Sequence, residues 1–531
     1  MNTYTRPIQG SKSCDLPSAM SFANFYQLTR RCLTVLFIAT ASTANAQNAT
    51  IIVGDTSGLV IRRNLYGQFA EHLGRGIYDG FYRSGKIRMD VVEALKKINI
   101  PVLRWPGGCF ADQYHWKDGI GPVASRPKTV NTTWGMVTED NSFGTAEFLT
   151  LCKLIGCQPY IAGNVGTGSP QEMKDWIEYL NFGGSSTLAD LRKTNGQAEP
   201  YHVPYWGVGN ESWGCGGLMP AETYATKYRT YALFCKNYPG SPLKKIAGGA
   251  DADDYNWTET LMKNIPLWEM WGLSFHYYTR DDATNNPHSA TQFDEADYFA
   301  FCKKALHMEE LISKHGAIMD KYDPQKKVAL VVDEWGIWVD TEPGTNPAFL
   351  YQQNSLRDAL IAASTLNIFN NHCDRVKMAN LAQTVNVIHS LILTKGDQML
   401  LTPTYAVFDL YKAHHDAKLL PLKLASPNYT FKGDSIPAVN ASASVTPDGI
   451  IHITLVNLDP KNEITVKTLS GHFANKRLNG KVLTSAKFTD YNTFDAPAKV
   501  AIRPFDQAHI VDNDLHITLP AKSVVELELK N

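Results

Sequence analysis

Two hydrophobic patterns alternate along most of the chain. Short runs that are nearly continuous in apolar and aromatic residues are typical of buried parallel strands, and segments with apolar residues every three or four positions are typical of amphipathic helices. Helices are expected, for example, at residues 89–98, 146–154, 221–235 and 354–369. Eight runs of the strand type occur, at residues 65–72, 101–108, 158–166, 203–211, 245–252, 272–278, 328–334 and 376–383. Alternation of this kind predicts an α/β fold, a (β/α)₈ TIM barrel.

The pattern changes after residue 405. Residues 451–457, 463–469 and 524–530 are rich in alternating and β-branched residues, with no helical period between them. They predict a C-terminal antiparallel β-sandwich, jelly-roll-like in form. The run at residues 49–53 also has strand character but lies outside the barrel order, so we expect it to pair into the sandwich. The predicted organisation is a signal peptide at 1–46, an N-terminal strand joining the sandwich at 47–60, the barrel at 61–405 and the sandwich at 406–531.

The N-terminal segment has the composition of an export signal. Arg30 and Arg31 precede an apolar stretch at residues 33–42, and the small residues Ala44 and Ala46 form a cleavage site before Gln47. The stretch is shorter than the roughly 20 residues that span a bilayer, and Met20 is an alternative start. We therefore expect an exported protein, periplasmic or secreted.

Composition excludes several classes of ligand. A formal net charge of -1, with 19% charged residues and no Lys/Arg-rich run in the body of the chain, gives no sign of a surface for nucleic acid or an anionic membrane. Of nine cysteines, removal of Cys14 and Cys32 with the leader leaves seven, without metal-binding spacing. We expect most of these to be buried free thiols. The substrate is expected to be neutral.

Two glutamates end predicted strands. Glu211 closes the fourth run and Glu334 the seventh, and barrel enzymes carry their catalytic side chains at the carboxyl ends of strands. Either glutamate alone fits a helix cap or an ion pair equally well. Together, a carboxylic acid and a carboxylate are the minimum needed to hydrolyse a glycosidic bond. The pair predicts a glycosidase.

Residues near these glutamates suit a sugar. Trp213 and Trp335 are candidate stacking platforms. The Gly-, Pro-, Ser- and Thr-rich segment at residues 119–141 is expected to be a long loop, either over the active-site face or as a plain surface excursion. Several histidines have two interpretations. His276, at a strand end, either orients Glu334 or binds substrate, or is structural, and the same ambiguity applies to His72 and His115.

No cofactor and no metal are expected. The mechanism requires neither, and the sequence has no tight cluster of ligands. Asp251, Asp253 and Asp254 lie close together, but acids after a strand are more often a solvated turn or a helix cap.

Five motifs occur in order across the barrel: GQFAEHLGRGIYDG, LRWPGGCFADQYHWKDGIGP, GVGNE, VVDEWGIW and MANLAQTVNVI. They resemble those of the α-L-arabinofuranosidases of glycoside hydrolase family 51. The resemblance implies a retaining enzyme with Glu211 as general acid/base and Glu334 as nucleophile, their carboxyl carbons about 5 to 5.5 Å apart. The substrate-binding residues that we predict are Glu71, Arg104, Cys109, Asn210, His276, Tyr278 and Gln383.

Cys109 departs from the family pattern. Many relatives have Asn at this position, where it contacts the sugar, and a thiol is a weaker hydrogen-bonding group than an amide. Either a hydroxyl of the sugar finds another partner, such as Asp112, or the pocket is adapted differently. The presence of Cys109 therefore leaves the choice of glycone undetermined by the sequence.

The predicted function is release of terminal, non-reducing α-L-arabinofuranosyl residues from arabinoxylan, arabinan and arabino-oligosaccharides. The alternatives are a related glycosidase acting on β-D-xylosides or β-glucans, or a non-catalytic carbohydrate-binding protein. The expected partner is an arabinofuranosyl-containing oligo- or polysaccharide, with no nucleic acid and no membrane after removal of the signal. The resemblance also implies a homo-oligomer, often a hexamer.

Overall fold

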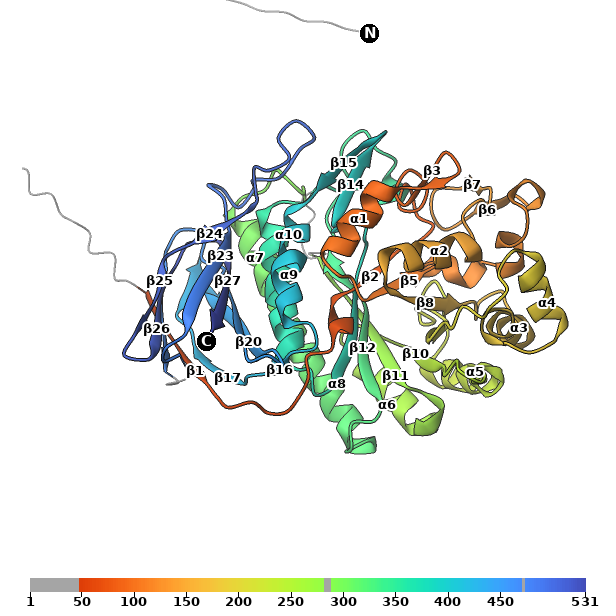
Figure 1. Ribbon diagram of the computed structural model, residues 1–531, viewed down its shortest axis with the longest axis horizontal. Helices are drawn as coiled ribbons and strands as arrows, with labels where there is room; N and C mark the ends of the chain where they lie inside the picture. The colour runs from red at the N-terminus through yellow and green to blue at the C-terminus, as the bar shows by residue number, and fades with distance from the viewer. Residues whose placement is uncertain (1–46, 281–287, 470–472) are drawn as a thin grey trace, which may run out of the picture. The chain divides into compact units, whose positions relative to one another are not determined.

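A closed barrel of eight parallel strands forms one part of the molecule, and two further sheets lie C-terminal to it (Figure 1). The computed structural model describes residues 47–280, 288–469 and 473–531, so the predicted leader lies outside the described residues. Each of the eight predicted runs supplies one barrel strand, which confirms the (β/α)₈ prediction. The strands are β2 (Gly67–Phe69), β5 (Val102–Trp105), β8 (Gln158–Gly163), β9 (Tyr205–Val208), β10 (Lys244–Asp251), β11 (Gly272–Thr279), β12 (Ala329–Ile337) and β13 (Val376–Leu381).

Helices surround this barrel, and the four that were predicted by position are confirmed. Local sequence sets their ends: Ser169 caps α3 by accepting a hydrogen bond from the Glu172 backbone N–H, and Gly156 ends α2 with φ 86°. Among the described residues, no helix has the length and apolar character needed to cross a membrane. The helices are α1 (Met89–Lys97), α2 (Thr145–Ile155), α3 (Pro170–Asn181), α4 (Thr187–Thr194), α5 (Ala221–Phe234), α6 (Tyr255–Asn264), α7 (Glu295–Leu306), α8 (Met308–Tyr322), α9 (Leu356–Asn371) and α10 (Pro403–Tyr411).

The C-terminal part is built from two largely antiparallel sheets. Side chains from both, such as Ile453 of β21 and Val466 of β22, belong to one hydrophobic core. β1 (Gln47–Val53) lies in the smaller sheet, parallel to β22 and antiparallel to β17. The sheets run β17-β1-β22-β26-β25 and β16-β20-β21-β27-β23-β24. Besides β1, the strands of these two sheets are β16 (Lys418–Leu419), β17 (Leu422–Ala425), β20 (Val439–Val445), β21 (Ile451–Asn457), β22 (Ile464–Leu469), β23 (Arg477–Leu483), β24 (Ile502–Phe505), β25 (Ala508–Val511), β26 (Asp514–Leu519) and β27 (Ser523–Lys530).

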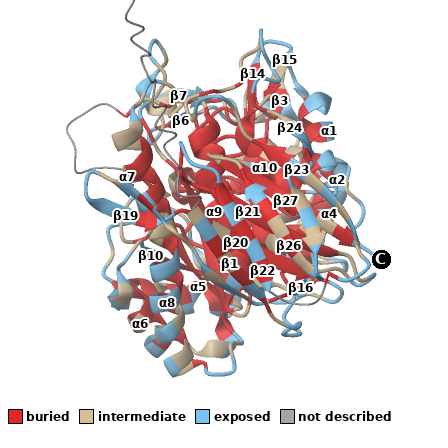
Figure 2. Ribbon diagram, turned by 90° about the vertical axis from the view of Figure 1, so that its left-hand side faces the viewer, coloured by how far each residue is buried: buried red, intermediate tan, exposed pale blue. Residues whose placement is uncertain are grey.

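Helix α9 joins the two parts. It contacts β12 of the barrel on one side and β20, β21 and β27 on the other, and residues 356–370 are all buried, as the red ribbon at the centre of Figure 2 shows. A helix buried on every face is expected to be largely apolar, which fits the many Ala, Leu and Ile residues of α9. Its buried polar residues have partners in the C-terminal part: Asn370 Nδ2 donates to Ser442 Oγ at 3.0 Å, and Asn367 Oδ1 accepts from Ser442 Oγ at 2.7 Å.

Candidate active site

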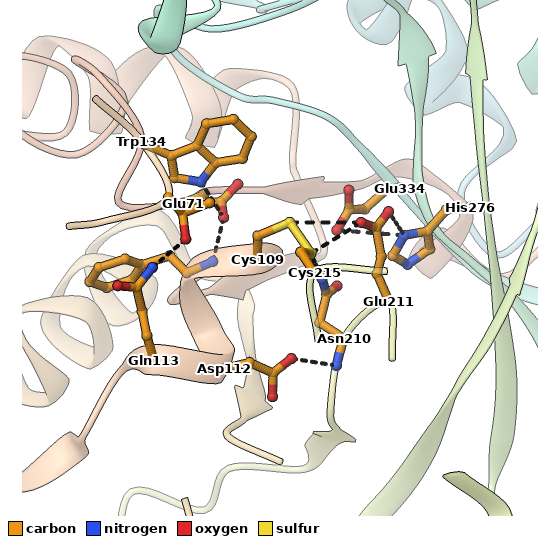
Figure 3. The surroundings of a disulfide bond; sticks show 12 residues. Glu71, Cys109, Asp112, Gln113, Trp134, Asn210, Glu211, Cys215, His276 and Glu334 are labelled. Carbon is orange, nitrogen blue, oxygen red and sulfur yellow. Dashed lines mark hydrogen bonds and ion pairs between the residues drawn. A yellow bond between two sulfur atoms is a disulfide. The ribbon is translucent and has the colours of Figure 1, made fainter. Parts of the chain in front are cut away.

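Glu211 and Glu334 meet at the carboxyl end of the barrel (Figure 3). Glu211 follows β9 and has φ 39°, in the left-handed region that non-glycine residues rarely occupy. Glu334 lies inside β12, so the prediction that it ends its strand is wrong: residues 335–337 continue to pair with β11. A register shift in that pairing sets His276 opposite Glu334. One ligating atom from each of Glu211, His276 and Glu334 lies within 4.8 Å of the other two.

The surroundings of Glu334 favour its ionised form. Arg104 Nη1 donates to Oε1 at 2.8 Å, and the Tyr278 hydroxyl donates to Oε2 at 2.6 Å. Burial by itself raises the pKa of Glu334, but the positive charges of His276 and Arg104 and these hydrogen bonds outweigh it and lower the pKa. The Glu334 side chain is therefore a carboxylate at neutral pH.

Glu211 is shifted the other way. Burial, together with the negative charge of Glu334, raises its pKa, and the hydrogen bond with His276 only partly opposes this. His276 Nδ1 lies 2.9 Å from Glu211 Oε1 and 3.7 Å from Glu334 Oε1. Burial lowers the pKa of His276, but the two carboxylates outweigh it and raise the pKa. Opposite pKa shifts in two neighbouring carboxyl groups keep one protonated, as an acid, and the other ionised, as a base.

Glu71 forms the opposite wall of the site. Its Oε1 accepts hydrogen bonds from the Phe110 backbone N–H and the Trp134 indole N–H, both at 2.9 Å, and Oε2 accepts from Gln383 Nε2 at 3.0 Å. Burial and the charge of Glu334 raise its pKa to about 7. Gly107 allows this packing, because a Cβ there would lie 3.0 Å from the Glu71 side chain.

The pattern of the sequence did not single out Trp134. It lies in the 119–141 segment, between β6 (Thr129–Asn131) and β7 (Val137–Glu139), so part of that loop does reach the site. The only signal was a tryptophan in a stretch otherwise rich in small and polar residues.

Arg104, Asn210 and Tyr278 complete the wall around Glu334. Arg104 Nη2 donates to Asn210 Oδ1 at 2.6 Å. Tyr278 contacts Glu334, whereas the neighbouring Tyr277 turns away and donates its hydroxyl to the Lys304 carbonyl. Within the described part of the chain, Gln383 Oε1 is a buried oxygen without a hydrogen-bond partner.

Cys109 is joined to Cys215 by a disulfide bond, which the sequence did not reveal because 106 residues separate the two. The prediction of a free thiol at position 109 is wrong. The Cys215 Sγ lies 3.4 Å and the Cys109 Sγ 3.8 Å from Glu211 Oε2, so the disulfide packs against the carboxyl group. The free cysteines found among the described residues are all buried, as predicted; they are Cys152, Cys157, Cys235, Cys302 and Cys373.

Asp112 does not replace the missing amide. Its Oδ1 accepts from the backbone N–H groups of Val165 and Gly166, at 2.7 and 2.8 Å, and its Oδ2 accepts from Asn210 at 3.2 Å. Burial raises its pKa to about 7. Asp112 therefore fixes the loops that carry the site.

The two tryptophans that were predicted to stack on sugars have different environments in the structure. Trp335 is 1% exposed and packs edge-on against Phe369, so its prediction as a sugar platform is wrong. Trp213 is half-buried, donates to the Gly249 carbonyl, and lines a cleft of about 1160 Å³ that begins at Glu211.

The remaining candidates are structural or peripheral. His72 is buried and bonded to Glu139 and Trp105, and His115 pairs with Glu172 away from the glutamate pair. Asp254 caps α6 by accepting from the Trp257 N–H, which confirms the cap interpretation for that acid. Asp251 and Asp253 line the cleft.

Within the described ranges, two groups of side chains have the donor atoms of a metal site. In one, Glu211 lies beside Cys109 and Cys215, whose sulfurs are bonded to each other and so are not thiolates. In the other, Glu211, His276 and Glu334 lie together, but the Arg104 guanidinium already neutralises Glu334, which disfavours a second cation.

Comparison with known proteins places this site in a family. Residues 94–298 match the family model of the α-L-arabinofuranosidase 1 domain, and residues 333–523 match that of the α-L-arabinofuranosidase C-terminal domain. The chain is 48% identical to an intracellular exo-α-L-arabinofuranosidase of Bacteroides ovatus, over 94% of this chain and 98% of the relative.

Solved structures agree. The GH51 arabinofuranosidase of Xanthomonas axonopodis pv. citri superposes with a TM-score of 0.88 at 47% identity, over 91% of this chain and 100% of that one. The α-L-arabinofuranosidase of Thermotoga maritima, solved with arabinose, gives a TM-score of 0.78 at 30% identity, over 91% and 99% of the two chains.

The relative from Bacteroides ovatus also corrects one prediction. Its name describes an intracellular enzyme, which contradicts the expectation that this chain is exported to a periplasm or secreted. That expectation rested on a short basic and apolar stretch, a local composition that is shared by segments other than signal peptides.

The similarity extends over both the barrel and the C-terminal sheets, and the barrel carries two acidic side chains with opposed pKa shifts at its carboxyl end. The chain therefore belongs to the α-L-arabinofuranosidases of glycoside hydrolase family 51.

Proposed function

We propose that the protein is a retaining, exo-acting α-L-arabinofuranosidase that releases terminal non-reducing arabinofuranosyl residues from arabinoxylan, arabinan and their oligosaccharides. The observation that carries the proposal is the Glu211–Glu334 pair, with oxygens within 4.8 Å of each other and pKa values shifted in opposite directions. Retaining enzymes hold their carboxyl groups about 5 to 5.5 Å apart, whereas inverting enzymes leave about 6.5 to 9.5 Å for a water molecule.

The proposed reaction has two displacements. In the first, the Glu334 carboxylate attacks C1 while Glu211 gives its proton to the departing oxygen, so that the C1–O bond breaks and a glycosyl ester forms. In the second, Glu211 takes a proton from water, which attacks C1 and releases Glu334. Arg104 and Tyr278 hold Glu334 in place for both attacks.

The glycone is proposed to bind among Glu71, Asn210 and Gln383. These side chains are at most 3% exposed, so this side of the site is its closed end. A closed end accepts a terminal sugar and excludes a continuing chain, which supports exo action. The unpaired Gln383 Oε1 is suited to accept a hydrogen bond from a sugar hydroxyl.

The first experiment measures hydrolysis of 4-nitrophenyl α-L-arabinofuranoside, with the corresponding β-D-xyloside as control. We expect the wild-type protein to prefer the arabinoside by at least tenfold in kcat/KM. Glu334→Ala should lose at least 10⁴-fold in kcat, a scale typical of removing a nucleophile. A preference for the xyloside would reject the proposed glycone.

Azide assigns the two roles separately. In Glu211→Ala, azide should react with the glycosyl ester and give the α-arabinofuranosyl azide, with the configuration retained. In Glu334→Ala, azide should enter in place of the lost carboxylate and give the β-azide. NMR of the products distinguishes these anomers, and the reversed assignment would exchange the roles of Glu211 and Glu334.

The homo-oligomer implied by the family resemblance stays a prediction. Light scattering coupled to size-exclusion chromatography measures the mass of the assembly directly.

A further inference from the structure

We propose that the cleft beside Glu211 binds the leaving-group side of the substrate as a neutral oligosaccharide of several sugar residues, and that a hairpin of the C-terminal part forms its far wall. This inference rests on the proposed function, and it adds a site and a ligand class. The hairpin consists of β18 (Asn428–Phe431) and β19 (Asp434–Pro437).

The cleft lies on the side of the site where the leaving group departs. Glu211, His276 and Tyr278 line it, whereas Glu71, Gln383 and the nucleophile Glu334 do not. A general acid must face the oxygen to which it gives its proton. The aglycone therefore extends from the active site into the cleft that Glu211 lines.

The far wall of the cleft comes from a different part of the chain. Asp434, Ile436 and Pro437 of the hairpin line it, beside residues of α7 such as Phe299 and Lys303. In the ribbon of Figure 2, β19 lies next to α7. A sugar chain leaving the active site thus runs over α7 towards the C-terminal part.

The hairpin is fixed to α7. Lys303 Nζ lies 2.5 Å from Asp434 Oδ2, and the ring of Phe299 packs against Tyr429 and Phe431 with centroid separations of 5.3 and 5.7 Å. These contacts hold the wall in one position before any ligand binds, which reduces the entropy lost on binding.

The lining fits a neutral carbohydrate. A volume of about 1160 Å³ exceeds that of pockets for drug-sized molecules, roughly 300–1,000 Å³, so several sugars fit. Tyr277, Trp213 and Trp338 supply aromatic surface for sugar faces. Apart from the proton donor Glu211, the lining contains five acidic side chains, against three lysine or arginine side chains and His276, so it has no excess of positive charge to attract an anionic ligand. The acidic side chains are Asp251, Asp253, Glu309, Glu310 and Asp434, and the basic residues are Arg280, Lys303 and Lys304.

The test compares long and short aglycones on the same preparation of enzyme. For the wild type, we expect kcat/KM for α-1,5-arabino-oligosaccharides to rise at least fivefold between the disaccharide and the pentasaccharide. Asp434→Lys breaks the ion pair with Lys303 and places a long side chain at the far wall, so this gain should fall at least threefold. Because the gain is a ratio, the fraction of folded enzyme cancels.

The matched control is Asp506→Lys, which makes the same substitution at an exposed position between β24 and β25. It should keep the wild-type gain. An absence of gain with length in the wild type, or an unchanged gain in Asp434→Lys, would overturn the inference. Hydrolysis of the aryl arabinoside by the wild type tests the proposed function separately, because this substrate has no oligosaccharide on its leaving-group side.

Inhibition tests the charge of the ligand. Xylotetraose has no arabinose to release and should inhibit aryl arabinoside hydrolysis competitively. A xylotetraose carrying a glucuronic acid should inhibit at least fivefold more weakly. Equal or tighter inhibition by the acidic oligosaccharide would reject a cleft selective for neutral sugars.

Discussion

His276 contacts both of the carboxyl groups that we propose to be catalytic. It is buried, it hydrogen-bonds Glu211 and lies 3.7 Å from Glu334, and its own pKa is raised by both. The imidazolium therefore lowers the pKa of both glutamates, although only Glu334 ends below its ordinary value. We therefore expect this one side chain to influence both limbs of the pH profile.

Replacing His276 should move both limbs in the same direction. The acidic limb of kcat/KM follows protonation of Glu334 and the alkaline limb follows loss of the proton from Glu211. In His276→Gln, the positive charge is lost, so the pKa values of both glutamates rise and both limbs shift to higher pH. The pH profile of kcat/KM measures this, with His509→Gln in β25 as control. Limbs that stay in place would show that His276 is neutral in the active enzyme.

Trp134 should matter through one hydrogen bond. Trp134→Phe keeps an aromatic ring but removes the N–H that donates to Glu71. An interaction of this kind with a charged group contributes about 1.5–3 kcal/mol, so we expect kcat/KM to fall roughly tenfold or more, mainly through KM if Glu71 binds the glycone. Steady-state kinetics measure the loss. Trp268→Phe, at a position 78% exposed, should leave both constants unchanged.

Single positions also show what the sequence could and could not specify. Glu211 and Glu334 were identified because each follows an apolar run. Trp335 was misassigned because adjacent side chains of a strand point to opposite faces: if Glu334 points into the site, Trp335 must point towards the outer helices. Trp134 had no such pattern, since its contact with Glu71 depends on how a loop folds back over the barrel.

Among elements, the disulfide connects two loops that carry the site. It joins the 3₁₀ helix Cys109–Gln113, after β5, to the turn that follows Glu211. The sulfurs also pack against the Glu211 carboxyl group. The bond therefore ties the turn that carries Glu211 to the loop after the second strand of the barrel.

Reduction of this bond should lower activity and stability together. A crosslink that closes a loop of 106 residues stabilises a protein by several kcal/mol, about 4.7 in the chain-entropy estimate. A Cys109→Ala, Cys215→Ala double variant should lose about 2–4 kcal/mol in free energy of unfolding, and its kcat should fall several-fold as Glu211 gains freedom. Urea unfolding and kinetics measure the two effects.

The wild type treated with a phosphine reductant should behave like the double variant, and the double variant itself should not respond. Alkylation after native reduction should label Cys109 and Cys215 while sparing buried thiols such as Cys152 and Cys302. Full activity of the reduced protein would show that the surrounding contacts alone position Glu211.

Strands were predicted correctly where the same hydrophobic pattern recurs along the chain. All eight barrel strands followed from continuous apolar runs because parallel strands are buried on both faces. The length of β12 was underestimated, since the pairing of residues 335–337 with β11 is a tertiary interaction. The disulfide was not predicted for the same reason: the two cysteines become neighbours only when the barrel closes.

For the whole molecule, the described residues from 47 onward form part of one compact unit. Helix α9 is buried between barrel and sheets, and β1 belongs to the C-terminal sheet although it precedes the barrel in the chain. We therefore expect the barrel and the C-terminal part to unfold together.

Adjacent positions of β1 test this coupling. Ile51 is fully buried and Ile52 is 47% exposed. Ile51→Thr should cost about 2–3 kcal/mol through lost burial and an added buried hydroxyl, and loss of activity on heating should shift to the same lower temperature as loss of secondary structure. Ile52→Thr, on the outer face, should cost less than about 1 kcal/mol. Circular dichroism and residual activity measure both, and activity that outlasts the C-terminal sheet would show independent domains.

The pairing of β1 with β22 also determines when β1 can fold during synthesis of the chain. Gln47 reaches the outside of the ribosome long before its partner Ile464 has been made. The backbone groups of the apolar strand β1 therefore stay without their β22 partners while the entire barrel is translated. During that interval we expect this segment to be available to chaperones, and neighbouring nascent chains on one polysome could pair wrongly through it.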